Sequence, residues 1–140
     1  MLNELDINIV RQLQEDIPIV SNPFKVLSEQ LGHDAIDNEG RHYEYKVAKS
    51  YSWNFQDISK KVLNKYKDDN KIILAVVDKN NFEIKKIYGM DSLRIIRILK
   101  KKLKEKKLRF KQQNKALRRL QVSISGADLK RMKAKLIYRS

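Results

Sequence analysis

The stretch GHDAIDNEGRHYEYKVA, residues 32–48, has the pattern of two short strands joined by a tight turn. Aromatic and β-branched residues on both sides favour strands, and the DNEG segment between them is typical of a turn. Asp34 precedes Glu44 by ten positions, and Glu44 precedes Lys46 by two. If the turn is centred near Glu39, Asp34 and Glu44 lie opposite each other across an antiparallel pair.

The second strand predicts one chemical face and one core face. Side chains two residues apart point the same way, so Glu44 and Lys46 project together while Tyr43, Tyr45 and Val47 face the core. Opposed carboxylates about 5 Å apart repel each other, and a hard divalent cation relieves that repulsion. We expect Mg²⁺, with the backbone carbonyl of Tyr45 as a further ligand and Lys46 beside the scissile phosphate. The alternative is a merely solvated strand face, because 34% of the chain is charged.

The composition indicates one strongly basic domain. The chain has 140 residues, enough to bury a core, and no linker or repeat divides it. Its 31 Lys and Arg exceed its 17 Asp and Glu, for a net charge of +14, which favours a polyanionic partner and DNA before RNA. The absence of cysteine excludes disulfides and thiolate metal sites.

We expect an α/β (α+β) fold with a central mixed sheet flanked by helices. Periodicity and turn residues predict two opening helices, a hairpin, a helix, two strands, a long basic helix and two terminal strands. These elements are expected at residues 3–16, 21–32, 33–37, 42–48, 56–69, 71–78, 82–88, 91–113, 120–125 and 134–138. The N-terminus is acidic and amphipathic and no run reaches 18 apolar residues, so we expect a soluble, cytoplasmic protein without membrane contact or organic cofactor.

The hairpin closely resembles the active-site hairpin of PvuII-like type II restriction endonucleases, members of the PD-(D/E)xK nuclease superfamily. The likeness includes the DNxG turn and the tyrosine before the glutamate, and it continues more weakly through residues 64–90. The resemblance implies a restriction-endonuclease-like core in which Asp34 and Glu44 bind metal and Lys46 is catalytic. The proline of the superfamily motif is replaced by His33.

The same resemblance places residues 50–59 in the major groove, although the histidines of the family are missing there. Asn54, Gln56 and Asp57 are able to pair with base edges, or Asn54 or Asp57 caps the helix that follows. Further DNA contacts are expected in the C-terminal half, from Arg118, Arg119, Gln121, Ser123 and lysines of the basic helix that include Lys100 and Lys104.

These features lead us to expect a single nuclease domain over residues 1–140, with helices at 1–32, a catalytic core at 33–90 and a DNA-binding region at 91–140. The expected activity is Mg²⁺-dependent cleavage of duplex DNA at a short palindrome, leaving 5′-phosphate ends. A two-fold palindrome calls for a homodimer, and the opening helices offer its interface. The expected interface residues are Ile9, Val10, Leu13 and Phe24.

Two alternatives remain open. A Holliday-junction resolvase would share the superfamily core, the dimer and the basic surface. A non-enzymatic regulator is the other alternative, because residues 5–32 also resemble the first two helices of a winged helix-turn-helix regulator of the leucine-responsive type. Its third helix should follow Gly32, where the sequence is strand-like instead.

Overall fold

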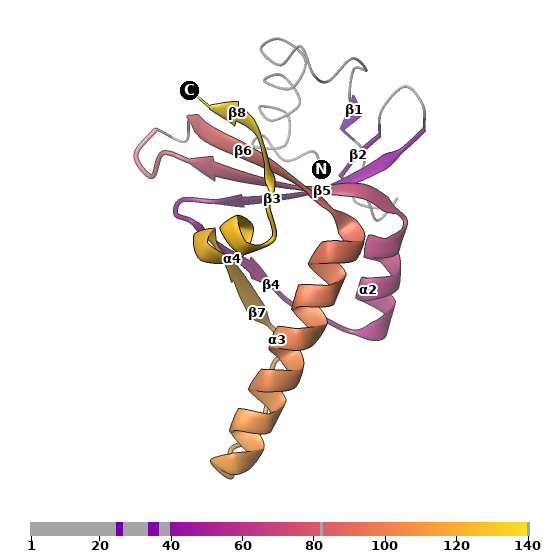
Figure 1. The fold of residues 1–140 in the computed structure, drawn as a ribbon, viewed down its shortest axis with the longest axis vertical. Helices are drawn as coiled ribbons and strands as arrows, with labels where there is room; N and C mark the ends of the chain where they lie inside the picture. The colour runs from indigo at the N-terminus through magenta and orange to yellow at the C-terminus, as the bar shows by residue number, and fades with distance from the viewer. Residues whose placement is uncertain (1–24, 27–33, 37–39, 82, 140) are drawn as a thin grey trace.

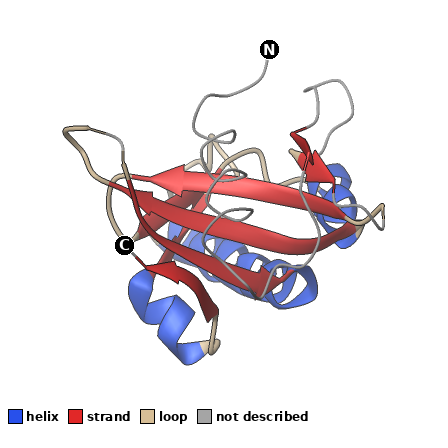
Figure 2. Cartoon of the chain, turned by 90° about the horizontal axis from the view of Figure 1, so that it is seen from above, coloured by secondary structure: helices blue, strands red, loops and turns tan. Residues whose placement is uncertain are grey.

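The fold is a six-stranded mixed sheet with helices and a two-stranded ribbon on one face (Figures 1 and 2). The computed structural model describes residues 25–26, 34–36, 40–81 and 83–139. The sheet has the order β1 (Lys25–Val26), β2 (Ala35–Ile36), β3 (His42–Ala48), β5 (Asp69–Val77), β6 (Ile84–Asp91) and β8 (Lys135–Arg139). The ribbon pairs β4 (Ser52–Phe55) with β7 (Val122–Ser125), and the helices are α2 (Lys60–Lys67), α3 (Ser92–Gln112) and α4 (Gly126–Arg131).

The expected mixed sheet flanked by helices is confirmed. Among the described strands of this sheet, β3 and β5 pair in parallel, because the chain crosses between them through β4 and α2, and the other neighbouring strands are antiparallel. Strand β5 is buried on both faces, with Ile72 and Leu74 packed on the helical side and Ile73 and Ala75 on the other. Nothing in this arrangement is specific to the expected restriction-endonuclease-like core.

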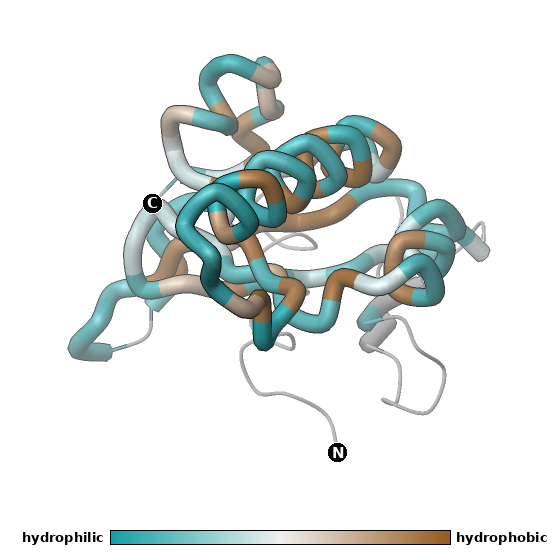
Figure 3. Tube along the Cα trace, turned by 90° about the horizontal axis from the view of Figure 1, so that it is seen from below, coloured by the Kyte–Doolittle hydropathy of each residue, from teal (hydrophilic) through white to brown (hydrophobic). Residues whose placement is uncertain are grey.

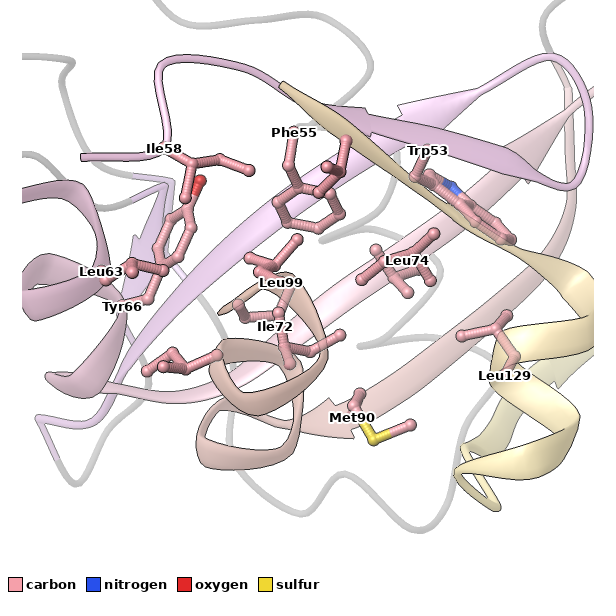
Figure 4. Packing of buried hydrophobic residues seen from close by; sticks show 14 of the residues in the cluster. Trp53, Phe55, Ile58, Leu63, Tyr66, Ile72, Leu74, Met90, Leu99 and Leu129 are labelled. Carbon is pink, nitrogen blue, oxygen red and sulfur yellow. The ribbon is translucent and has the colours of Figure 1, made fainter. Parts of the chain in front are cut away.

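The ribbon closes the core over the helical face of the sheet. Its buried side chains alternate with polar ones, so Trp53 and Phe55 enter the core (Figure 4), as does Ile124. The indole nitrogen of Trp53 donates a hydrogen bond of 2.9 Å to the carbonyl of Ala75 in β5. This bond fixes the ribbon against the sheet and leaves the opposite face of the ribbon to solvent.

Helix α3 is amphipathic over its first half and solvated over its second. Ile95, Ile96, Leu99 and Leu103 recur at helical spacing and are buried against the sheet and ribbon. Asp91 caps the helix by accepting a hydrogen bond of 2.9 Å from the backbone of Leu93. Beyond its buried stripe the helix extends past the sheet and is mostly hydrophilic (Figures 1 and 3). None of the described helices is long and apolar enough to cross a membrane.

The sequence did not predict β4 or α4, and the expected helix at 3–16 lies outside the described residues. The helix expected at 21–32 is wrong at Lys25–Val26, which form strand β1 and pair with β2, and its other residues lie outside the described part of the chain. The alternative role of Asn54 or Asp57 as a helix cap is wrong. Asn54 lies within β4, and Asp57 has a φ of 52° in the connection to α2. The cap of α2 is Ser59, whose hydroxyl accepts a hydrogen bond from Val62.

Candidate functional site

The hairpin brings its two acidic residues together as the turn predicted. Strands β2 and β3 pair Ala35 with Tyr43, and the same register aligns Asp34 with Glu44 one step further along. The backbone N–H of Asp34 donates a hydrogen bond of 3.0 Å to the carbonyl of Tyr43. Gly40 in the connection has a φ of 80°, a left-handed conformation that glycine adopts without steric cost.

Glu44 is an acid in an unusual environment. It is only 8% exposed and faces the helical side of the sheet, where the ammonium of Lys65 in α2 lies 3.8 Å from its Oε2. Burial, and after it the neighbouring Asp34 carboxylate, raises the pKa of Glu44 to about 8, against the opposing charges of Lys65 and Lys46. A cation bound beside Glu44 would restore its ionised form at neutral pH.

Asp34, Tyr45 and Lys46 surround this carboxylate. The backbone N–H of Tyr45 donates a hydrogen bond of 2.7 Å to Oδ2 of Asp34. Because the N–H and C=O of one strand residue point to the same side, the Tyr45 carbonyl faces the strand edge where Asp34 lies. The ammonium of Lys46 lies 5.2 Å from the ring centre of Phe55, on the same sheet face as Glu44.

This donor set fits a hard cation that keeps much of its water. Among residues 34 and 40–139, apart from the masked positions, no group of three or more His, Asp or Glu side chains is arranged to hold a metal. Mg²⁺ commonly binds proteins through one or two carboxylates and completes its shell with water and substrate phosphate. Asp34, Glu44 and the Tyr45 carbonyl provide that minimal set.

The structure also unites four of the expected DNA-contact residues. Strands β4 and β7 pair Asn54 with Ser123, and hydrogen bonds continue the pairing on both sides, from Ile58 to Leu120 and from Gly126 to Tyr51. The solvent face of the ribbon therefore presents two rows of polar side chains, Ser52 with Ser125 and Asn54 with Ser123. Gln56 and Gln121 each lie one residue beyond the paired segment, next to Phe55 and Val122.

A groove of about 390 Å³ runs between this polar face and α3. We call it the ribbon groove, and its lining residues are Asn54, Lys102, Glu105, Lys106, Arg109, Gln121, Val122 and Ser123. Lys102 donates a hydrogen bond of 2.7 Å to the carbonyl of Ser123, and Lys106 donates one of 2.7 Å to the carbonyl of Gln121. These bonds hold two positive charges in fixed places along β7.

The remaining expected DNA contacts lie elsewhere. Lys100 and Lys104 are exposed on α3, but Lys104 is about half a turn from Lys102 and Lys106 and so lies on the flank away from the ribbon groove. Arg118 and Arg119 are exposed in the connection before β7. The expected dimer residues Ile9, Val10, Leu13 and Phe24 lie outside the described part of the chain.

Sequence reasoning missed Lys65 and Arg109. Lys65 has a usable signal, because it precedes the buried Tyr66 on α2 and shares the helical stripe of Val62. Arg109 has no such sequence signal, because it is one of many basic residues on α3. The pairing of β4 with β7 shows which flank of the helix faces the ribbon, and Arg109 lies on that flank.

A family model for the siroheme decarboxylase NirDL-like HTH domain matches residues 6–35. This is less than a quarter of the chain and ends where β2 begins. No curated protein matches the chain. The helix-turn-helix is a DNA-binding motif, so the match supports DNA binding.

The expected membership of the PvuII-like restriction endonucleases is therefore wrong, and so is the expected type II restriction activity. The match is to a helix-turn-helix domain, which agrees in part with the regulator alternative and supports neither a restriction enzyme nor a resolvase. The resemblance depended on three charged residues and a turn, and so short a motif recurs by chance in a highly charged sequence. The strand-like sequence after Gly32 does not exclude the regulator alternative, because the matched segment already ends where β2 begins.

Proposed function

We propose that this protein is a regulator-like DNA-binding protein that contacts duplex DNA through the solvent face of the β4–β7 ribbon and the ribbon groove. The observation that carries the proposal is the pairing of Asn54 with Ser123 beside a groove lined by Lys102, Lys106 and Arg109. Polar side chains able to pair with bases and basic side chains able to bind phosphate thus lie next to each other on one surface. The helix-turn-helix match over residues 6–35 supports the same class of partner.

The ribbon has suitable dimensions and chemistry for the major groove. A two-stranded antiparallel ribbon fits that groove, and amide side chains pair with adenine through two hydrogen bonds. Asn54, Gln56 and Gln121 supply such amides, and Asn54 and Gln121 line the ribbon groove. The adjoining cations of α3 suit the phosphates that border the groove.

Arg109→Gln and Asn54→Ala should weaken DNA binding in different ways. A preferred duplex is first selected from a random pool, and affinities are then measured by fluorescence anisotropy at several salt concentrations. Arg109→Gln should weaken binding to every sequence and lower the slope of log K against log salt by about 1. Asn54→Ala should cost about 1–3 kcal/mol on the preferred duplex alone and leave the slope unchanged.

Lys79→Gln, an exposed change in the turn before β6, is the matched control and should alter neither quantity. If wild-type protein shows no salt-dependent DNA binding, the proposed function is wrong. If the protein binds DNA but both variants match Lys79→Gln, the ribbon is not the contact surface and binding belongs to the segment that matches the helix-turn-helix domain.

A second candidate function is cation-dependent phosphodiester hydrolysis, which the geometry of Asp34, Glu44 and Lys46 favours. Mg²⁺ held by the two carboxylates would polarise the phosphate and activate water for attack. Two residues of the hairpin would support this chemistry, one by a fixed carboxylate and the other by a positive charge. Asp34 is held by the Tyr45 N–H, and the Lys46 ammonium would stabilise negative charge growing on the phosphate.

Lys46→Met should lower the rate of DNA cleavage by roughly 100-fold or more, while DNA affinity changes far less, because charge stabilisation acts mainly in the transition state. Cleavage of linear duplex, single strands and four-way junctions is followed in Mg²⁺ and in EDTA. Lys67→Gln on the exposed side of α2 is the control. Equal losses of rate and affinity would make Lys46 a simple phosphate contact, and an inactive wild type would exclude hydrolysis but leave DNA binding intact.

A further inference from the structure

A second basic groove lies along the first half of α3, beside the end of α4. We call it the helix groove; it has a volume of about 390 Å³ and is lined by Arg94, Arg97, Ile98, Lys101, Arg131, Met132 and Lys133. Five of these seven residues are cations, and none is acidic. Ile98 and Met132 are half-buried and pack against the core, so they form an apolar floor between the charges. None of these residues was singled out by the sequence.

Two of the five cations are already held in place by the fold. Arg94 donates a hydrogen bond of 3.1 Å from Nη1 to the carbonyl of Met132 at the end of α4. Nη2 of Arg131 lies 2.5 Å from Oδ1 of Asp128. Because these guanidinium groups are positioned before any ligand arrives, less side-chain freedom is lost when an anion binds.

Lys133 occupies a backbone position that favours glycine. Helix α4 ends in a Schellman motif, in which the N–H of Lys133 bonds to the carbonyl of Lys130 and the N–H of Ala134 bonds to that of Leu129. The residue at this point is left-handed, and Lys133 has a φ of 55°. A lysine there is strained where glycine would not be, and its side chain lines the helix groove.

We propose that the helix groove binds the sugar–phosphate backbone of nucleic acid. Arg97, Lys101 and Lys133 would meet phosphate oxygens, and the apolar floor would pack against the sugars between them. An acidic protein is the competing ligand, but its carboxylates would not use the apolar floor in the regular way that alternating sugars and phosphates do. This inference rests on the proposed DNA-binding function and extends it to a second surface.

The two grooves follow one another along α3. Residues 94–101 line the helix groove and residues 102–109 line the ribbon groove, so together they span the helix from Arg94 to Arg109. At 1.5 Å per residue this is about 22 Å, or roughly six base pairs of duplex. A backbone that leaves the ribbon groove along α3 therefore reaches the helix groove, and binding there should require DNA that extends beyond the part held in the ribbon groove.

The test uses the double variant Arg97→Gln/Lys101→Gln and the single variant Lys133→Gly in the full chain. On a 20-base-pair duplex that contains the selected site, we expect the double variant to lose roughly tenfold in affinity and to lower the salt slope by about 2. On a duplex shortened until it covers only the site held in the ribbon groove, and so ends before the helix groove, we expect no difference from wild type. A 20-nucleotide single strand then distinguishes a groove that accepts either form of backbone from one that needs a duplex.

Lys133→Gly should change stability and DNA affinity in opposite directions, which a purely structural role of Lys133 would not do. Glycine relieves the strained backbone, so the midpoint of thermal unfolding should rise while affinity for the long duplex falls. The control is Lys79→Gln/Lys85→Gln, a double change at the opposite end of β6 from α3.

The inference is overturned if the double variant binds the long duplex as that control does, or if it loses equal affinity on both lengths. These results leave the proposed function standing when Arg109→Gln still weakens binding. If wild-type protein binds no duplex of either length, the proposed function and this inference both fail.

Discussion

Glu44→Gln should raise the free energy of unfolding at pH 8 and remove most of its pH dependence above pH 5. The pKa of Glu44 is raised from 4.5 to about 8, chiefly by burial and then by the adjacent Asp34 carboxylate. Between these values the folded protein retains a proton that the unfolded chain has released, so wild-type stability falls as the pH rises through this range. The shift corresponds to at most about 5 kcal/mol above pH 8, and glutamine avoids that cost with the same shape.

Urea unfolding at pH 5, 6.5 and 8 measures this effect. The two proteins should be close in stability at pH 5, and the difference should grow toward pH 8. Glu83→Gln replaces an exposed carboxylate and serves as the control. Parallel pH curves for wild type and Glu44→Gln would show that Glu44 is not the titrating group.

Adding a divalent cation distinguishes two roles for Glu44, a metal ligand or a buried acid that binds no metal. If Asp34 and Glu44 bind Mg²⁺, millimolar Mg²⁺ at pH 8 should stabilise wild type and leave Glu44→Gln unchanged, because a ligand that binds only the folded state raises its stability. The same addition should have no effect if Glu44 is simply a destabilising residue of the core. This measurement needs no DNA and is independent of cleavage.

The hairpin was predictable because its information is local. The turn residues and the spacing of Asp34 and Glu44 set the register, and strand alternation set the faces of Tyr45 and Lys46. Helix α3 was predictable for a similar reason, since a long stripe of buried residues identifies a helix. What these local patterns cannot give is the partner of an isolated strand.

The ribbon shows this limit. Strand β4 has four residues, and its partner β7 lies nearly 70 positions further along the chain, so no turn connects them. Asn54 and Ser123 were each candidates, but only the fold makes them one surface. Helix α4 had a local signal that was overlooked: Ser125 and Asp128 have the spacing of a capping box, and both of its hydrogen bonds form.

Function was harder to predict than fold because charge patterns are shared among protein classes. Asp34, Glu44 and Lys46 lie close together, yet the matching family model is a helix-turn-helix domain over residues 6–35, a segment that includes Asp34. The proximity of these three side chains therefore does not establish the family. The residues that contact DNA therefore have to be identified by the binding of variants in the ribbon groove and the helix groove, and not from the sequence motif of the hairpin.

Asp128→Ala should be the most destabilising of the substitutions considered, by about 3–5 kcal/mol, because it removes the buried member of an ion-pair network. The carboxylate of Asp128 is fully buried and accepts hydrogen bonds from Lys102, from Arg131 at 2.5 Å, and from the backbone of Ser125 at 2.8 Å. These partners come from α3, α4 and β7, so one side chain joins three elements. Urea unfolding at pH 7 measures the loss, and Glu105→Ala, at an exposed residue of α3 that lines the ribbon groove, should change the stability little.

The pH dependence of this network has the opposite sign to that of Glu44. Burial alone would raise the pKa of Asp128, but hydrogen bonds from Lys102 and Ser125 outweigh it and lower the pKa from 3.8 to about 2. The stabilisation is complete above about pH 4 and is lost as the pH falls through 2, so wild type and Asp128→Ala should converge in acid. If the difference in unfolding free energy between wild type and Asp128→Ala stayed constant down to pH 2, the destabilisation would come from lost packing and not from lost charge.

Asp128 also links the two proposed DNA-binding grooves, since Lys102 lines the ribbon groove and Arg131 lines the helix groove. Asp128→Asn keeps the shape but gives up the charge that attracts both cations. In conditions where this variant remains folded, its affinity for a 20-base-pair duplex should fall although a negative charge has been removed. General electrostatics predicts the reverse, because the net charge becomes more positive. Tighter binding by Asp128→Asn would therefore show that total charge, and not the placement of Lys102 and Arg131, determines DNA affinity.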